Sequence, residues 1–154
     1  MESSAWNSRA QAELDAATSA PPPGPIVCRG VRGATTADAN TREAIVEATA
    51  DLVRRVLDAN AIRTDDIASV IFSTTPDLDA EFPAVVRTQL GWQDVALMCN
   101  HEMGVPGALP RCIRVLIHWN TTRSLREIVH VYIRGAEALR PDRATPPTGD
   151  ARQA

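Results

Sequence analysis

One long amphipathic segment stands among five short β-rich runs, and this arrangement sets narrow limits on the fold. Between residues 41 and 60 the apolar side chains recur every three or four positions, which is the period of an α-helix; they are Ile45, Ala48, Leu52, Val53, Val56 and Leu57. Asn40 or Thr41 can cap the start of this helix, and Glu43 follows Asn40 by three residues. Because one face of the helix is apolar, we expect it to pack against a sheet.

The β-rich runs are the expected strands, at residues 26–31, 68–74, 95–99, 112–119 and 130–139. Gly30 and Gly33 predict a sharp bend at the end of the first strand, and Gly135 predicts a bulge in the last. A second, short helix is expected to begin near Pro83 and to end at Gly91. Since strands and helices alternate only in part, the pattern predicts an α/β (α+β-like) fold with a mixed β-sheet of about five strands, packed by helices on one face.

The two ends of the chain differ in composition from its middle. Apart from Met1, the only large apolar side chains in residues 1–25 are Trp6 and Leu14, and this segment ends in the run PPPGP. We therefore expect a flexible arm. Residues 143–154 show no periodicity and are expected to form a flexible tail. The remaining segment, residues 26–142, has the length of one domain.

Charge, hydropathy and cysteine content argue against several classes of protein. The 154 residues include 16 basic side chains, all Arg, against 19 acidic ones, and a net charge of −3 argues against a nucleic-acid partner. No apolar run approaches the length of a membrane span, and residues 1–25 lack the pattern of a secretory signal, so we expect a cytoplasmic protein. The three cysteines contain no C-x-x-C pair, which favours reduced thiols over disulfides or a zinc site.

Arg114 interrupts the apolar run at residues 112–117, which should be an interior strand. Strand alternation places its side chain on the same face as that of His118. A buried guanidinium needs an anion beside it, because its desolvation costs several kcal/mol. That anion is either a bound ligand or, as a structural alternative, the carboxylate of Glu102 or Asp142.

Three other residues stand in places that are typical of binding sites. Glu102 follows a predicted strand directly, Arg32 lies between two glycines that would let a ligand approach the backbone, and Tyr132 lies in the last strand. Each also has a structural explanation, as a solvated loop acid, an Arg at a strand end and a core tyrosine respectively.

Signatures of metal, phosphate or nucleophile chemistry are weak. His101, His118, His130 and Cys99 lack the spacings of a ligand set, and VRGATT is no phosphate-binding loop. A nucleophilic pair of Cys99 and His101 has little support from the neighbouring positions. We therefore expect neither a metal nor a cofactor.

Four blocks taken together resemble the trimeric chorismate mutases of the small α/β class. They are VRGATT at residues 31–36, STTPDLDAEFPA from Ser73, MCNHEMGVPGALPRCIRV from Met98 and HVYIRGAEALRPD from His130. The blocks are long, they keep one order and a similar spacing, and they cover residues 26–142.

The resemblance implies an isomerase that converts chorismate to prephenate, at the branch of aromatic amino acid biosynthesis leading to phenylalanine and tyrosine. This reaction is an intramolecular Claisen rearrangement, which needs no nucleophile, metal or redox cofactor. The resemblance also implies a homotrimeric pseudo-α/β-barrel whose active sites lie at subunit interfaces. From the charge and the lack of a long apolar run, we expect neither a nucleic acid nor a membrane as a partner.

For the reacting centre, the resemblance implies that Arg114 lies beside the ether oxygen whose bond breaks, where negative charge grows in the transition state. Glu102 would accept a hydrogen bond from the ring hydroxyl of the substrate. Cys99 would lie beside Glu102 as part of the binding surface.

For substrate binding, the resemblance implies that Arg32 and Tyr132 hold a carboxylate and that Arg87 adds positive charge at the pocket mouth. Phe82 and Leu139 would be apolar walls that keep the substrate compact.

The chain departs from the family pattern at two places. Val85-Val86 stand in a shorter segment that lacks a lysine found in the family, and Met98 stands where a small hydroxyl residue can occur. One alternative is therefore a non-catalytic trimeric protein on the same scaffold that binds carboxylates or regulates. A trimeric enamine or imine deaminase is a further alternative, although its sequence blocks are absent here.

Overall fold

The computed structural model describes residues 23–143. The larger elements are five strands, β1 (Val27–Thr36), β2 (Ile67–Thr74), β3 (Leu97–His101), β4 (Cys112–Thr121) and β5 (Val131–Tyr132), and two α-helices, α2 (Arg42–Asn60) and α3 (Arg87–Leu90). Short 3-10 turns connect them. Most of the expected arm at residues 1–25 and of the expected tail at residues 143–154 lies outside the described residues.

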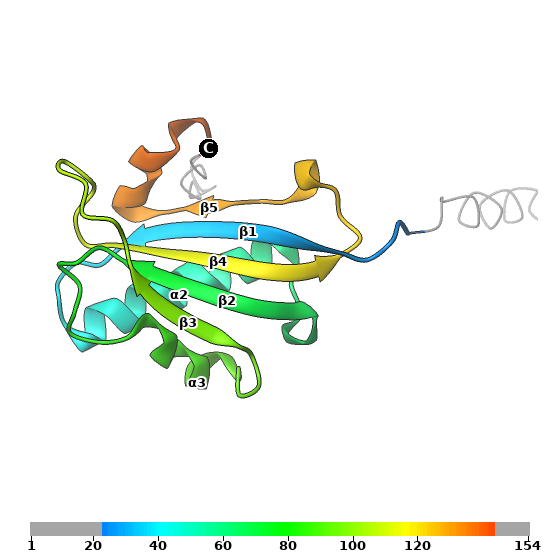
Figure 1. Ribbon diagram of the computed structural model, residues 1–154, viewed down its shortest axis with the longest axis horizontal. Coiled ribbons are helices and arrows are strands. Elements are labelled where there is room, and N and C mark those ends of the chain that lie inside the picture. Colours follow the sequence, from blue (N-terminus) through cyan, green and yellow to red (C-terminus); the bar gives the residue numbers. More distant parts are fainter. Residues whose placement is uncertain (1–22, 144–154) are drawn as a thin grey trace, which may run out of the picture.

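The strands form one mixed sheet in the order β3-β2-β4-β1-β5. β4 runs antiparallel to both β1 and β2, whereas β2 pairs with β3, and β1 with β5, in parallel. Both α2 and α3 lie behind the same face of the sheet (Figure 1). The predicted mixed sheet with helices on one face is thus confirmed.

Alternation along β4 shows why the two faces of the sheet differ. Ile113, Val115 and Ile117 are buried in the helix-covered core, whereas Arg114 and Leu116 retain exposed surface on the other side. We call this second side the open face; it includes Arg32 of β1 and Ser73 of β2, which share the register of Leu116 and Arg114 respectively. Within residues 23–143, the open face is the one opposite α2 and α3, and it carries both polar and apolar side chains.

Helix α2 has the boundaries that its apolar period predicts. Thr41 is the N-cap, with its side chain accepting a hydrogen bond from the Ala44 amide at 3.2 Å, and Ala61 in the left-handed region at φ 53° ends the helix. The buried Asn60 donates from Nδ2 to the Val129 carbonyl at 2.8 Å and accepts from the Val129 amide at 2.8 Å. These two bonds tie the helix end to the segment that leads into β5.

The expected bend at Gly30 and Gly33 is wrong, because β1 continues through both glycines to Thr36. Gly33 is instead needed for packing. A Cβ atom there would lie 2.9 Å from Val56 Cγ2 and 3.0 Å from Leu52 Cδ1, both on α2. The absence of a side chain therefore lets the helix approach the strand closely.

The expected strand at residues 130–139 is also wrong over most of its length. Only Val131–Tyr132 pair with β1, and Arg134–Leu139 form a 3-10 helix. The chain turns at Arg134, whose φ is 54°, and the Gly135 amide then donates to Thr36 Oγ1 at 3.2 Å. The left-handed conformation at Arg134 ends the strand and carries Leu139 back over the sheet edge.

Candidate active site

A pocket of about 480 Å³ opens on the open face where β1, β2 and β4 meet the segment after β5. Five of the eight residues expected at the site line it: Arg32, Glu102, Arg114, Tyr132 and Leu139. Three guanidinium groups are present, because Arg140 lines it as well. Such a pocket suits a ligand with more than one negative charge.

Arg114 and Glu102 form an ion pair in this pocket, with Nε 3.5 Å from Oε1. The expected burial of Arg114 is wrong, since its side chain is 46% exposed in the single chain. Its strand is central, but its position in the alternation places it on the open face. Of the two protein anions considered, Glu102 is the partner, whereas the Asp142 carboxylate binds Arg140 at 2.9 Å.

Glu102 is held at two points. Its backbone amide donates to the Thr74 carbonyl at 2.8 Å, which extends the parallel pairing of β2 and β3 by one residue. Its carboxylate oxygen Oε1 accepts a hydrogen bond from Ser73 Oγ. The side chain is 24% exposed, so the carboxylate lies at the wall of the pocket rather than in free solvent.

Arg32 and Tyr132 reach the pocket from neighbouring strands. The Arg32 amide donates to His130 Nδ1 at 3.0 Å, and Tyr132 pairs with Ala34 in the parallel register of β1 and β5. Tyr132 is only 5% exposed, so its ring forms part of a small apolar cluster beneath the pocket. Tyr132 therefore lines the pocket and also belongs to the core.

Ser73 and Arg140 are among the lining residues that the sequence-based set lacks. The pairing of β2 with β4 places Ser73 opposite Arg114 in the pocket, and a single sequence gives no signal for this pairing. Arg140 directly follows Leu139, and this neighbour of an expected wall residue was the available signal. The Arg140 guanidinium donates a hydrogen bond to the Asp142 carboxylate, which raises the pKa of Arg140 further. The positive charge of Arg140 is therefore permanent.

Three expected site residues lie elsewhere in the single chain. Phe82 and Cys99 line a separate pocket of about 340 Å³, and Arg87 lines a third hollow beside Trp92. Asn100 and His101 line both the first and the second pocket, so these two adjoin. The chain therefore brings together one group of five residues and leaves the other three outside it.

The nucleophilic pair of Cys99 and His101 gains no support from the structure. Burial raises the pKa of the Cys99 thiol, which keeps it protonated and weakly nucleophilic. The His101 ring contacts Thr74, with Nδ1 3.2 Å from Thr74 Oγ1. Neither side chain shows the mutual contact that nucleophile activation requires.

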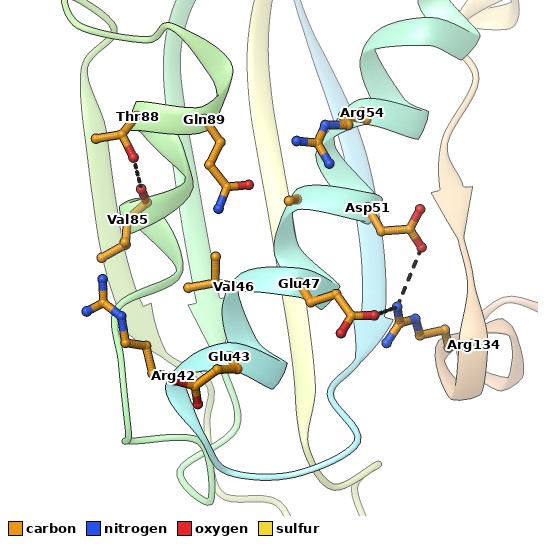
Figure 2. A pocket seen from close by; sticks show the side chains of 11 residues that line it. Arg42, Glu43, Val46, Glu47, Asp51, Arg54, Val85, Thr88, Gln89 and Arg134 are labelled. Carbon is orange, nitrogen blue, oxygen red and sulfur yellow. Dashed lines mark hydrogen bonds and ion pairs between the residues drawn. The ribbon is translucent and has the colours of Figure 1, made fainter.

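A further hollow, of about 740 Å³, lies on the helix side between α2 and α3 (Figure 2). None of the eight expected residues lines it. Arg134 reaches toward it and pairs with Glu47 at 3.4 Å and with Asp51 at 3.8 Å (Figure 2). These ion pairs fasten the segment after β5, and with it Leu139, to helix α2.

Within residues 23–143, no three His, Cys, Asp or Glu side chains are arranged to hold a metal ion. No helix in this described range is long and apolar enough to span a membrane.

Comparison with known proteins decides among the families that could use such a pocket. Residues 28–143 match the family model of chorismate mutase type I. The chain belongs to the chorismate mutase type I family. It is therefore a chorismate mutase, an isomerase, and the resemblance drawn from the four sequence blocks is confirmed.

Individual relatives agree with this family assignment. The chain is 47% identical over 115 residues to chorismate mutase AroH of Thermus thermophilus, covering 74% of this chain and 94% of the relative. It is 41% identical over 118 residues to chorismate mutase AroH of Bacillus subtilis (strain 168), covering 76% and 93%. A solved structure of chorismate mutase from Clostridium thermocellum superposes with a TM-score of 0.70 at 45% identity, over 71% of this chain and 98% of that chain.

Proposed function

We propose that the pocket between Arg32, Glu102 and Arg114 binds chorismate and promotes its rearrangement to prephenate. The observation that carries this proposal is the ion pair of Arg114 and Glu102 inside a pocket that holds two further guanidinium groups. A dianionic substrate meets positive charge there, while the Glu102 carboxylate remains to accept a hydrogen bond from the ring hydroxyl.

The chemistry asks the protein for two things. In the rearrangement a C–O bond breaks while a C–C bond forms within one molecule, so no proton or electron has to leave the substrate. The protein has to hold the enolpyruvyl side chain over the ring and stabilise the charge that develops as the C–O bond breaks. Arg32, with the Tyr132 hydroxyl, holds a carboxylate, and Leu139 confines the ring.

Arg114 supplies the charge stabilisation. Its guanidinium has five N–H donors, and the pair with Glu102 engages only one edge of it. Arg114 lines the pocket, and donors that Glu102 does not engage bind the ether oxygen as it becomes negative. This interaction is stronger in the transition state than in the ground state, so it acts on kcat.

The site is completed by a neighbouring subunit of a homotrimer. In the single chain Phe82 is 69% exposed and Met98 is 57% exposed, and helices α2 and α3 lie on the side of the sheet opposite the open face. A second copy placed on this face brings its Phe82, Cys99 and Arg87 against the pocket. Such a shared site explains why three expected residues lie outside the first group.

The Val85-Val86 departure leaves no replacement for the lysine of the family pattern. Val86 is fully buried, and Val85 lines the hollow between α2 and α3. Neither side chain can reach a carboxylate of the substrate. Capture of the second carboxylate then relies on Arg87 and Arg140.

The chain acts in a reducing compartment, the cytoplasm. Cys28, Cys99 and Cys112 are all free thiols.

The catalytic domain spans residues 26–142, with the arm and the tail outside it.

A cofactor-free assay tests the activity, and subunit mixing tests the shared site. Purified protein with chelator present should convert chorismate to prephenate with saturation; binding of a bicyclic transition-state analogue without turnover would contradict catalysis.

Arg114→Ala and Phe82→Asp each disable one half of the site. After subunit exchange, an equal mixture should regain activity at about a quarter of the sites, as expected for random heterologous interfaces. No recovery in exchanged trimers would contradict a shared site.

A further inference from the structure

We propose that Ser73 is a positioning residue for this reaction, because it fixes which oxygen of Glu102 is left to the substrate. The inference rests on the proposed role of Glu102 as the acceptor for the ring hydroxyl. Ser73 itself does not touch the reacting atoms.

Three neighbouring strands place the residues concerned. Ser73 lies on β2 in register with Arg114 on β4 and with Asn100 on β3, two residues before Glu102. Ser73 Oγ donates to Glu102 Oε1, and Arg114 Nε lies 3.5 Å from the same oxygen. Both protein contacts therefore converge on Oε1, while Oε2 takes part in neither.

This division of the carboxylate has a chemical consequence. A carboxylate beside an Arg tends to form a bidentate pair, in which both oxygens bind the guanidinium fork. Such a pair would occupy the Glu102 oxygen needed for the substrate hydroxyl and two of the Arg114 donors needed for the ether oxygen. The Ser73 hydroxyl also binds Oε1 and so keeps the carboxylate from turning both of its oxygens toward the guanidinium fork.

The backbone alone cannot provide this control. Glu102 follows the last residue of β3, and its amide is anchored to the Thr74 carbonyl, but its side chain has three rotatable bonds. Within the described residues, the contacts recorded for its carboxylate are those with Ser73 and Arg114. Loss of the Ser73 hydroxyl would leave Arg114 alone to set its orientation.

A matched pair of variants isolates the hydroxyl. Ser73→Thr keeps it, whereas Ser73→Val replaces it by a methyl group of similar shape, so any cost of the larger side chain in β2 is common to both. We expect Ser73→Val to lower kcat about tenfold relative to Ser73→Thr, the size of a hydrogen bond to a charged group. Ser69, which also lies on β2, provides the control: Ser69→Ala removes a hydroxyl that contacts His118 Nδ1 on β4, and this variant should retain kcat.

The interaction is confirmed or rejected by repeating the pair in a Glu102→Ala background. We expect the Thr-to-Val difference in kcat to disappear there, because Ser73 acts only through Glu102. If Ser73→Val equals Ser73→Thr while Glu102→Ala is impaired, the inference about Ser73 is overturned and the proposed role of Glu102 stands. If Glu102→Ala itself keeps wild-type kcat and KM, the proposed role of Glu102 fails, and the inference fails with it.

Discussion

Gly33 of β1 and Val56 of α2 pack so closely that a Cβ atom on Gly33 would lie 2.9 Å from Val56 Cγ2. The same glycine lines the pocket between Arg32 and Ala34. The close contact between α2 and β1 therefore fixes the position of the strand that carries Arg32.

We predict that Gly33→Ala lowers the free energy of unfolding by about 1–3 kcal/mol, because the added methyl overpacks the core. Gly30→Ala is the matched control on the same strand, since its Cβ would meet only Leu116 Cδ1 at 3.4 Å. Urea unfolding of both variants measures the difference. Equal stability of the two variants would contradict the packing role of Gly33.

Arg32→Ala should raise KM for chorismate with a smaller change in kcat. In its proposed role Arg32 contacts a substrate carboxylate that is present in both the ground state and the transition state, so its loss should weaken the binding of both alike. Arg29→Ala, on the same strand but outside the pocket, should leave KM unchanged. A change confined to kcat would show that Arg32 acts on the reacting centre instead.

Asp77 provides a test by pH. The Thr75 side chain hydrogen-bonds to the Asp77 carboxylate, and the Arg111 amide donates to it at 2.8 Å; these bonds lower its pKa below 3.8. A lowered pKa means that this stabilisation is present above the ordinary value and is lost as the pH falls through the folded-state pKa. Asp77→Asn should therefore be less stable than wild type at pH 7, by about 0.5–1 kcal/mol for an exposed group.

The stability difference for Asp77→Asn should shrink toward zero as the pH falls below about 3.8, the ordinary pKa of the group. Urea titrations at neutral and acid pH measure it. Asp65→Asn is the control, because Asp65 has only a 4.0 Å contact with Arg63 at the surface. A difference that does not change with pH would contradict the charged hydrogen bond.

Removing residues 1–25 should leave assembly and kcat unchanged. The family match begins at residue 28 and β1 begins at Val27, so the removed segment precedes both in the sequence. Light scattering and the chorismate assay on the truncated chain test this. Loss of assembly would make the arm a structural element.

Much of the fold could be predicted because its signals are local. The period of apolar residues in α2, the Pro83 start and Gly91 end of the next helical segment, and the apolar run of β4 each depend on near neighbours in sequence. The path of β1 through Gly33 and the turn at Arg134 could not be predicted, since both depend on distant contacts. Gly33 is explained by α2, and Arg134 by its acidic partners Glu47 and Asp51.

The candidate site divides along the same line. Strand alternation predicts that Arg114 shares a face with Leu116, but not that this face is the one without helices. The pairing of Arg114 with Glu102 was one of two options, and the position of Glu102 at the end of β3 selects it. The pocket of a single chain is not lined by Phe82, Cys99 or Arg87. Their proposed role requires a neighbouring subunit, which one sequence does not describe.

The most direct test of the central proposal is kcat of Arg114→Ala, measured on assembled protein with saturating chorismate. We predict a loss of about 10² or more, as for removal of a transition-state donor, and a poor rate for Arg114→Lys, which keeps the charge but not the planar fork. Near wild-type turnover of folded Arg114→Ala would contradict the proposal that Arg114 stabilises the transition state.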